Sequence, residues 1–272
     1  MNSKLILKEF IDSNVLFKLI YKTNVMNNQL LVKNILILDS SFNPPHKAHL
    51  SLINNSINYY NTKIHKEKIE NEVLLLFSTN NADKKFDNTI EDFSNRLNMV
   101  KLFADYINVY SGNNVRIGLT KNAKFINKYN SIKEEFSSLK TDINKFIFLM
   151  GFDTLIRVFD SKYYKPLTVE ESLDEFIRNS RLFVLTRKMN ENDRDSYGLQ
   201  TGYLDRISRT EKIIPIDWLS HIDLIENSEK EMTSVSSSDI RKRIGLNEDD
   251  WQFHVVDSIR DYIIERGLYR GR

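Results

Sequence analysis

ILILDSSFNPPHKAHLSLI, residues 35–53, runs from an apolar strand through a proline-rich turn into a helix. From residue 34 onward the chain keeps alternating short apolar runs with longer amphipathic ones. Parallel strands that are connected by helices give this pattern. The runs NEVLLLFS (71–78) and KFIFLMG (145–151) are apolar without alternation, as in strands covered on both faces. The sequence therefore predicts an α/β fold with an open, doubly wound parallel sheet.

The periodicity predicts six strands, five intervening helices and two final helices. The expected strands are Ile35–Asp39, Glu72–Ser78, Val115–Leu119, Lys145–Met150, Arg181–Thr186 and Ile213–Ile216. The expected helices are Ala48–Tyr60, Asp92–Asn108, Phe125–Leu139, Asp153–Phe159, Leu173–Asn179, Ser237–Arg243 and Trp251–Arg266. The polar stretch Lys188–Gly202 has no apolar period and is interpreted as a surface loop or flexible connection.

Composition excludes several classes of protein and of site. The 272 residues carry 39 Lys and Arg against 37 Asp and Glu, so a general nucleic-acid or membrane-surface binder is not expected. No apolar run approaches the roughly 20 residues that cross a bilayer. Cysteine is absent, which excludes disulfides, thiolate zinc sites and a cysteine nucleophile. We expect the chain in the cytoplasm, with the nucleus as the alternative, and the oligomeric state stays open.

The first 33 residues precede the expected nucleotide-binding fold. Apolar residues recur there at about helical spacing, from Leu5 to Leu19, and charges are spread between them. We interpret residues 1–33 as a helical extension and residues 34–272 as the main domain. A targeting segment is the alternative, although the stretch lacks the small-residue cleavage site of a secretory signal.

The turn after residue 39 is the first candidate site, because ligands of a doubly wound sheet lie beyond the carboxyl ends of its strands. His46 and His49 stand one helical turn apart near the start of the helix. A helix N-terminus offers N–H groups to an anion, and histidine adds donors for a phosphate. Each histidine could instead cap or pack, and a zinc pair would need a third ligand that is not apparent nearby.

A second candidate site is TSVSSSDIRKRIG (233–245), which places several hydroxyls immediately before a helix. Ser236 or Ser237 is a good N-cap, and Arg241 follows about one turn later. Hydroxyls, backbone N–H groups and a guanidinium together suit a triphosphate. Taken alone, the segment is more typical of an ordinary serine-capped helix with a solvated arginine.

SFNPPHKAH (41–49) resembles the first signature of the nucleotidyltransferase superfamily, G-S-F-N-P-x-[TH]-x-x-H, as found in nicotinamide or nicotinate mononucleotide adenylyltransferases. The resemblance implies a Rossmann-like domain with C-terminal helices. It also implies that His46 and His49 bind ATP phosphates and stabilise the transferring phosphoryl group. Ser41, Phe42 and Asn43 are implied to contact ATP. Ser40 departs from the family, which has glycine there.

VSSSDIR (235–241) resembles the second family signature, I-S-S-T-x-I-R. By this resemblance Ser236, Ser237 and Ser238 bind the ATP phosphates, and Arg241 neutralises the departing pyrophosphate. GFD (151–153) resembles the family's G-x-D motif, which implies that Gly151 and Asp153 help to hold the nucleotide. Without the other motifs, a helix start with a capping acid is an equally plausible interpretation of GFD.

The resemblance is weakest on the acceptor side. STNNADKKF (78–86) resembles a loop whose lysines approach substrate phosphate, which makes Lys84 and Lys85 candidates. The family tryptophan after the third strand is missing from VRIGLTKNAKF (115–125). Where a second tryptophan is usual, SKYY (161–164) offers Tyr163 and Tyr164 for stacking on the pyridine ring.

The resemblance implies an adenylyltransferase that uses ATP, with Mg²⁺ carried by the ATP phosphates, and nicotinamide mononucleotide as acceptor. Nicotinate mononucleotide is the alternative acceptor. Ser40 and the missing tryptophan keep open a related transferase with another acceptor, or an ATP hydrolase. A nucleotide-binding scaffold without turnover is the alternative from another class.

Overall fold

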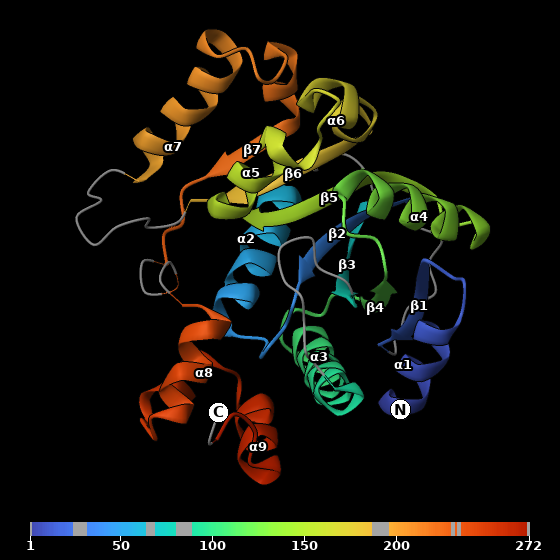
Figure 1. Ribbon diagram of the computed structural model, residues 1–272, viewed down its shortest axis with the longest axis vertical. Coiled ribbons are helices and arrows are strands. Elements are labelled where there is room, and N and C mark those ends of the chain that lie inside the picture. The colour runs from blue at the N-terminus through green and yellow to red at the C-terminus, as the bar shows by residue number, and fades with distance from the viewer. Residues whose placement is uncertain are drawn as a thin grey trace.

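The computed structural model describes residues 2–23, 32–63, 69–79, 89–186, 196–229, 232 and 235–270. Its strands form one sheet in the order β1-β4-β3-β2-β5-β6-β7 (Figure 1). All neighbours from β4 to β7 pair in parallel, and β1 pairs antiparallel with β4. The strands are β1 Phe17–Lys22, β2 Val32–Ser40, β3 Ile69–Ser78, β4 Val115–Thr120, β5 Ile143–Gly151, β6 Ser180–Leu185 and β7 Ile222–Ile225. The predicted doubly wound, Rossmann-like architecture is confirmed.

Strand β2 marks the point where the direction of winding reverses. The chain moves outward from β2 to β3 and β4, and then returns to the other side of β2 to add β5, β6 and β7. The connections on the two sides of β2 therefore diverge at its carboxyl end. In open α/β sheets this divergence leaves a crevice that takes ligands.

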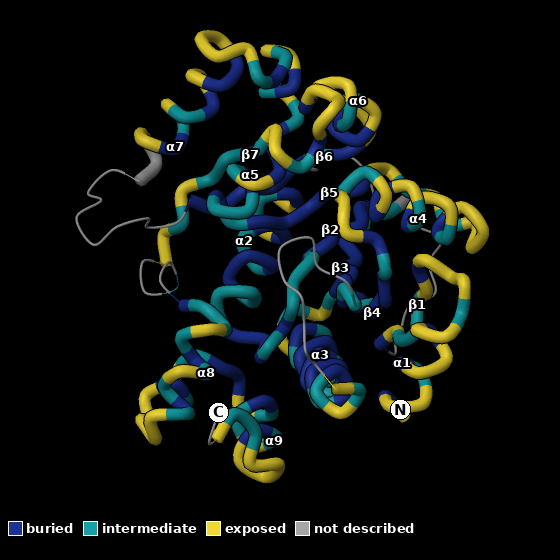
Figure 2. Tube along the Cα trace, in the orientation of Figure 1, coloured by how far each residue is buried: buried dark blue, intermediate teal, exposed yellow. Residues whose placement is uncertain are grey.

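Helices cover both faces of the sheet. They are α1 Ser3–Asp12, α2 Lys47–Lys63, α3 Ile90–Ser111, α4 Phe125–Ser138, α5 Phe152–Val158, α6 Val169–Asn179, α7 Ser196–Asp205, α8 Ser237–Gly245 and α9 Asp257–Arg266. Along β2, Leu36 and Leu38 face a core formed with α1, α2, α3, α8 and α9, whereas Ile35 and Ile37 face a core formed with α4, α5, α6 and α7. Figure 2 shows the buried sheet between these layers. None of the helices in the described ranges is long and apolar enough to cross a membrane.

The N-terminal segment differs from the expected helix. Helix α1 ends at Asp12, where Ser13 adopts an extended backbone (φ −80°, ψ 167°). Phe17–Lys22 then forms a strand that pairs with β4. The aromatic and β-branched residues of this strand favour an extended backbone, and the strand pairs along the outer side of β4. The segment is therefore half helix and half strand, and its strand belongs to the main sheet.

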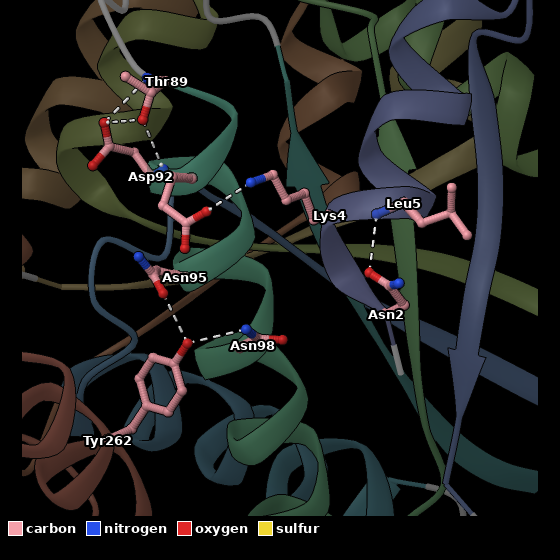
Figure 3. Close-up of polar contacts among 9 residues, drawn as sticks. Asn2, Lys4, Leu5, Thr89, Asp92, Asn95, Asn98 and Tyr262 are labelled. Carbon is pink, nitrogen blue, oxygen red and sulfur yellow. Dashed lines mark hydrogen bonds and ion pairs between the residues drawn. The ribbon is translucent and has the colours of Figure 1, made fainter.

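Helix α3 anchors both ends of the described chain. The Ser3 hydroxyl of α1 donates to Asn98 Oδ1 at 2.6 Å. From α9, the Tyr262 hydroxyl donates to Asn95 Oδ1 at 2.9 Å and accepts a hydrogen bond from Asn98 Nδ2 at 3.0 Å. Figure 3 shows Tyr262 between the two asparagines, with α1 on another side of α3. The expectation that the N-terminal helix packs on the body is thus confirmed for α1.

Three other expected elements were wrong in part. Residues 213–216 are not a strand, because Pro215 precedes the short 3₁₀ helix Ile216–His221, and the edge strand is β7. The closing helix is interrupted at Val255, which is extended, so that α9 starts only at Asp257. Within the stretch interpreted as a loop, α7 begins at Ser196, and residues 187–195 lie outside the described chain.

Candidate active site

A cavity of about 500 Å³ opens at the carboxyl ends of the central strands. Its walls come from the ends of β2, β3, β5 and β6 and from the starts of α2, α4 and α8. Eleven residues predicted from the sequence line it: Ser41, His46, His49, Gly151, Asp153, Tyr163, Tyr164, Ser236, Ser237, Ser238 and Arg241. The structure therefore brings both signature segments and the G-x-D segment to one site at the predicted edge of the sheet.

Buried contacts hold the turn between β2 and α2. Phe42 has a positive φ of 45°, which is uncommon for a residue with a side chain, and its ring is completely buried. Beneath the turn, Arg96 donates from Nε and Nη2 to the Ser41 carbonyl oxygen at 3.0 and 2.5 Å. Burial lowers the pKa of Arg96 to about 10, so its guanidinium is still charged at neutral pH. Arg96 thus fixes the backbone from which the residues predicted to bind phosphate project.

The two histidines lie together at the start of α2. Their rings stack with centroids 3.7 Å apart and an angle of 24° between planes. His46 is buried, and both rings line the cavity. Two imidazolium charges at this separation would repel each other, and a bound anion would offset that repulsion.

Hydrogen bonds fix the tautomer of His49. The backbone N–H of His46 donates to His49 Nδ1 at 3.1 Å, so Nδ1 accepts and the proton of the neutral ring is on Nε2. His49 Nε2 lies 2.9 Å from Ser40 Oγ and therefore donates to it. His49 is a hydrogen-bond donor toward the cavity, and its Nε2 cannot act as a base in this state.

Helix α8 is docked directly on the turn after β2. Ser237 Oγ donates to the Pro44 carbonyl oxygen at 2.9 Å, and Arg241 Nη1 donates to the Asn43 carbonyl oxygen at 2.5 Å. Ser236 caps the helix by accepting from the Asp239 backbone N–H at 3.1 Å. Burial lowers the pKa of Arg241. Segments almost 200 positions apart in the chain thus form one wall.

The G-x-D segment is tightly packed at the end of β5. A Cβ on Gly151 would lie only 2.9 Å from Asp153 Oδ1, so no larger residue fits without displacing that carboxylate. Arg157, one turn further along α5, donates from Nη2 to Asp153 Oδ2 at 3.1 Å. Asp153 consequently has a fixed position at the cavity wall.

The predicted acceptor residues have different outcomes. Tyr163 and Tyr164 both line the cavity, but Tyr164 is buried and its hydroxyl donates to the Val158 carbonyl oxygen at 2.6 Å. Tyr163 is half-buried and is the better placed of the two for a ligand. Lys84 and Lys85 lie outside the described residues. The roles of all four in acceptor binding stay predictions.

One polar corner of the cavity was not predicted from the sequence. Asp39, Ser78, Phe125 and Lys128 line it from the ends of β2 and β3 and from α4. Asp39 and Ser78 each end an expected strand, which was an available signal. Lys128 interrupts the apolar face that Phe125 shares with the later turns of that helix, but a lysine at such a position does not by itself indicate a site.

The described residues contain no group of three or more His, Asp or Glu side chains that could hold a metal ion. Asp39 and Asp153 are each paired with a cation, Lys128 and Arg157 respectively.

Comparisons with known proteins agree with this geometry. The model of the family described as cytidylyltransferase-like matches residues 37–243. A Schizosaccharomyces pombe relative, provisionally named a nicotinamide mononucleotide adenylyltransferase, is 31% identical over 225 residues, which are 82% of this chain and 81% of the relative. An Acholeplasma laidlawii relative, provisionally named a nicotinate-nucleotide adenylyltransferase, is 26% identical over 236 residues, which are 86% of this chain and 97% of the relative.

Solved structures share the fold at low sequence identity. Plasmodium falciparum nicotinic acid mononucleotide adenylyltransferase, complexed with NaAD, matches with a TM-score of 0.52 at 18% identity. The same enzyme complexed with APC matches with a TM-score of 0.53 at 19% identity. Each match covers 87% of this chain and 97% of the other. The family model and the S. pombe relative show that the chain belongs to the cytidylyltransferase-like family, among its nicotinamide and nicotinate mononucleotide adenylyltransferases.

Proposed function

We propose that this chain transfers AMP from ATP to nicotinamide mononucleotide, forming NAD and releasing pyrophosphate. The docking of α8 on the turn after β2 carries the proposal, because it surrounds one part of the cavity with phosphate donors. The names of the two relatives support a pyridine mononucleotide as acceptor. Nicotinate mononucleotide is the second candidate, since one relative carries its name.

The reaction needs no general base, because the attacking phosphate of the acceptor is already ionised at neutral pH. Positioning and charge stabilisation then supply the catalysis. His49 suits this task, because its Nε2–H can leave its hydrogen bond to Ser40 and donate to a phosphoryl oxygen of ATP instead. His46, stacked against it, supplies a second imidazole beside the same oxygens.

The leaving pyrophosphate is assigned to the α8 side of the cavity. Ser236, Ser237 and Ser238 stand at the helix start, and Arg241 points from its second turn toward Asn43. A cation and several N–H and O–H donors lower the energy of the developing negative charge. Mg²⁺ enters as part of the substrate, bound to the ATP phosphates. Gly151 and Asp153 contact the nucleotide from the opposite wall.

The test is product formation by the purified protein with ATP, Mg²⁺ and either mononucleotide. Dinucleotide, pyrophosphate and free phosphate are measured separately. His49→Ala is compared with His254→Ala, a matched histidine variant outside the cavity. We expect His49→Ala to lose about 100-fold or more in kcat, the usual cost of one transition-state donor, while ATP still binds. The His254→Ala variant should keep normal turnover.

The outcomes separate the alternatives. Dinucleotide formation that only His49→Ala abolishes supports the proposal. Free phosphate without dinucleotide would favour ATP hydrolysis, and pyrophosphate that appears only with another acceptor would change the substrate. ATP binding with no product from any acceptor would favour a scaffold. Full turnover of His49→Ala would contradict the assigned site.

The cytoplasm, with the nucleus as the alternative, is our proposed location of the protein.

A further inference from the structure

The cavity has a charged corner that the phosphate chemistry does not use. Lys128 Nζ lies 2.5 Å from Asp39 Oδ2, and Ser78 Oγ donates to Asp39 Oδ1 at 3.0 Å. Only 6% of the Lys128 side chain and 12% of the Asp39 side chain are exposed. Burying both charges costs hydration free energy, and apolar residues of similar volume would pack here without that loss. A site that uses the charges would account for their presence.

This corner lies at the acceptor end of the cavity. Helices α8 and α4 pack on opposite faces of the sheet, and Figure 1 shows them on opposite sides of β2. In-line transfer requires the nucleophile and the leaving group on opposite sides of the α-phosphorus. Because α8 is assigned to pyrophosphate, the acceptor must approach from the side of β3 and α4, where Asp39 and Lys128 lie.

The same corner contains an aromatic side chain. Phe125 is half-buried and lines the cavity, and its ring packs edge-on against Phe148 at 5.9 Å and at a tilt against Phe176 at 6.1 Å between centroids. Lys128 Nζ lies 5.4 Å from the centre of the Phe125 ring. A pyridine ring that stacks on Phe125 would therefore carry its substituent close to the Lys128 ammonium.

We propose that the Asp39–Lys128 pair selects the acceptor by the substituent on its pyridine ring, favouring a neutral carboxamide over a carboxylate. This inference rests on the proposed function. Lys128 has N–H donors beyond the one that Asp39 accepts, and Asp39 has further lone pairs. A carboxamide presents both a carbonyl oxygen and an amino group, so it matches both partners. A carboxylate is attracted by Lys128 but repelled by Asp39, and it loses its hydration without a net gain.

Substitution of Asp39 gives the sharpest test. Asp39→Asn keeps the shape of the side chain but leaves the Lys128 charge uncompensated. The ratio of kcat/KM for nicotinamide mononucleotide to that for nicotinate mononucleotide should then fall by about tenfold or more, because the carboxylate now meets a net positive charge. Lys128→Met should shift the ratio in the opposite direction. Lys133→Met, an exposed position on the same helix, is the matched control and should leave the ratio unchanged.

Binding of both mononucleotides to the same four proteins, measured by calorimetry, separates this inference from the proposed function. If the wild type makes no dinucleotide, the proposed function fails, but the ratio of dissociation constants must still shift in Asp39→Asn. Equal losses for both acceptors in Asp39→Asn would show that the pair is only structural and overturn the inference. A wild type that prefers the carboxylate, or that binds neither mononucleotide, would overturn it as well.

Discussion

Ser40 stands where the family signature has glycine. Its hydroxyl oxygen accepts a hydrogen bond from the Nε2–H of His49. ATP must replace that contact before His49 can donate to a phosphate. Ser40→Ala should therefore lower the KM for ATP by about three- to tenfold, the range that one net hydrogen bond gives. Steady-state kinetics with varied ATP measures this. An unchanged or higher KM would mean that Ser40 does not compete with the phosphate.

Gly151 tests the close packing at the G-x-D segment. In Gly151→Ala the new methyl group would lie 2.9 Å from Asp153 Oδ1 and push the carboxylate away. ATP should then bind about tenfold more weakly, since misplaced groups lose most of their contribution. Gly202→Ala is the matched control, because nothing lies within 4 Å of a Cβ there. Calorimetric titration with ATP compares the two variants, and equal affinities would refute the role of the segment.

Single site residues could be predicted from the sequence where they lie within or next to a motif. His46, His49 and Arg241, which line the cavity, could be predicted as candidates because turn chemistry and helix starts surround them in the sequence. Lys128 was missed, because a lysine in an amphipathic helix is usually solvated and only the tertiary structure brings it to Asp39. The contact of Arg96 with the Ser41 carbonyl oxygen likewise joins residues 55 positions apart.

At the scale of the element, helix α6 owes its start to a capping box. Thr168 Oγ1 accepts from the Glu171 backbone N–H at 3.1 Å, and Glu171 Oε2 accepts from the Thr168 backbone N–H at 2.8 Å. Thr168→Ala should cost about 1 kcal/mol of unfolding free energy, the usual cost of losing an N-cap. Urea denaturation measures the loss. Adenylyl transfer should stay at the wild-type rate, since Thr168 does not line the cavity.

The central strands could be predicted from the sequence, whereas the edge elements could not. Runs such as NEVLLLFS are apolar on both faces, and only a covered strand gives that pattern. Strand β1 was mistaken for helix because its apolar residues continue the spacing of α1, and only pairing with β4 makes it extended. Ile213 and Ile214 were predicted to lie in a strand, because a partly buried loop can be as apolar as a strand.

At the scale of the whole molecule, Asp223 ties the outer strands to α2. It accepts hydrogen bonds from Tyr59 and Tyr60 and forms a bidentate ion pair with Arg181. Burial alone would raise the pKa of Asp223, but the bonds to Arg181 and the two tyrosines outweigh it and lower the pKa from 3.8 to about 2. The ionised form is therefore favoured in the folded protein.

The sign of the pH dependence follows from this lowered pKa. The stabilisation by Asp223 is complete above pH 3.8 and is lost as the pH falls toward 2. Asp223→Asn should be less stable than wild type at pH 7 by about 2 kcal/mol, and the difference should shrink between pH 4 and 2. Urea denaturation across this range measures it. A difference that does not depend on pH would show that the carboxylate charge is not what stabilises the fold.

Adenylyl transfer can be followed in parallel reactions with ATP labelled at the α- or the γ-phosphorus. If the chain cleaves ATP between its α- and β-phosphates and passes the adenylyl group to a mononucleotide, the α label enters the dinucleotide and the γ label leaves as pyrophosphate, in equal amounts. This is the result that we expect. Release of the γ label as free phosphate, with the α label retained in ADP, would show that the chain hydrolyses ATP instead.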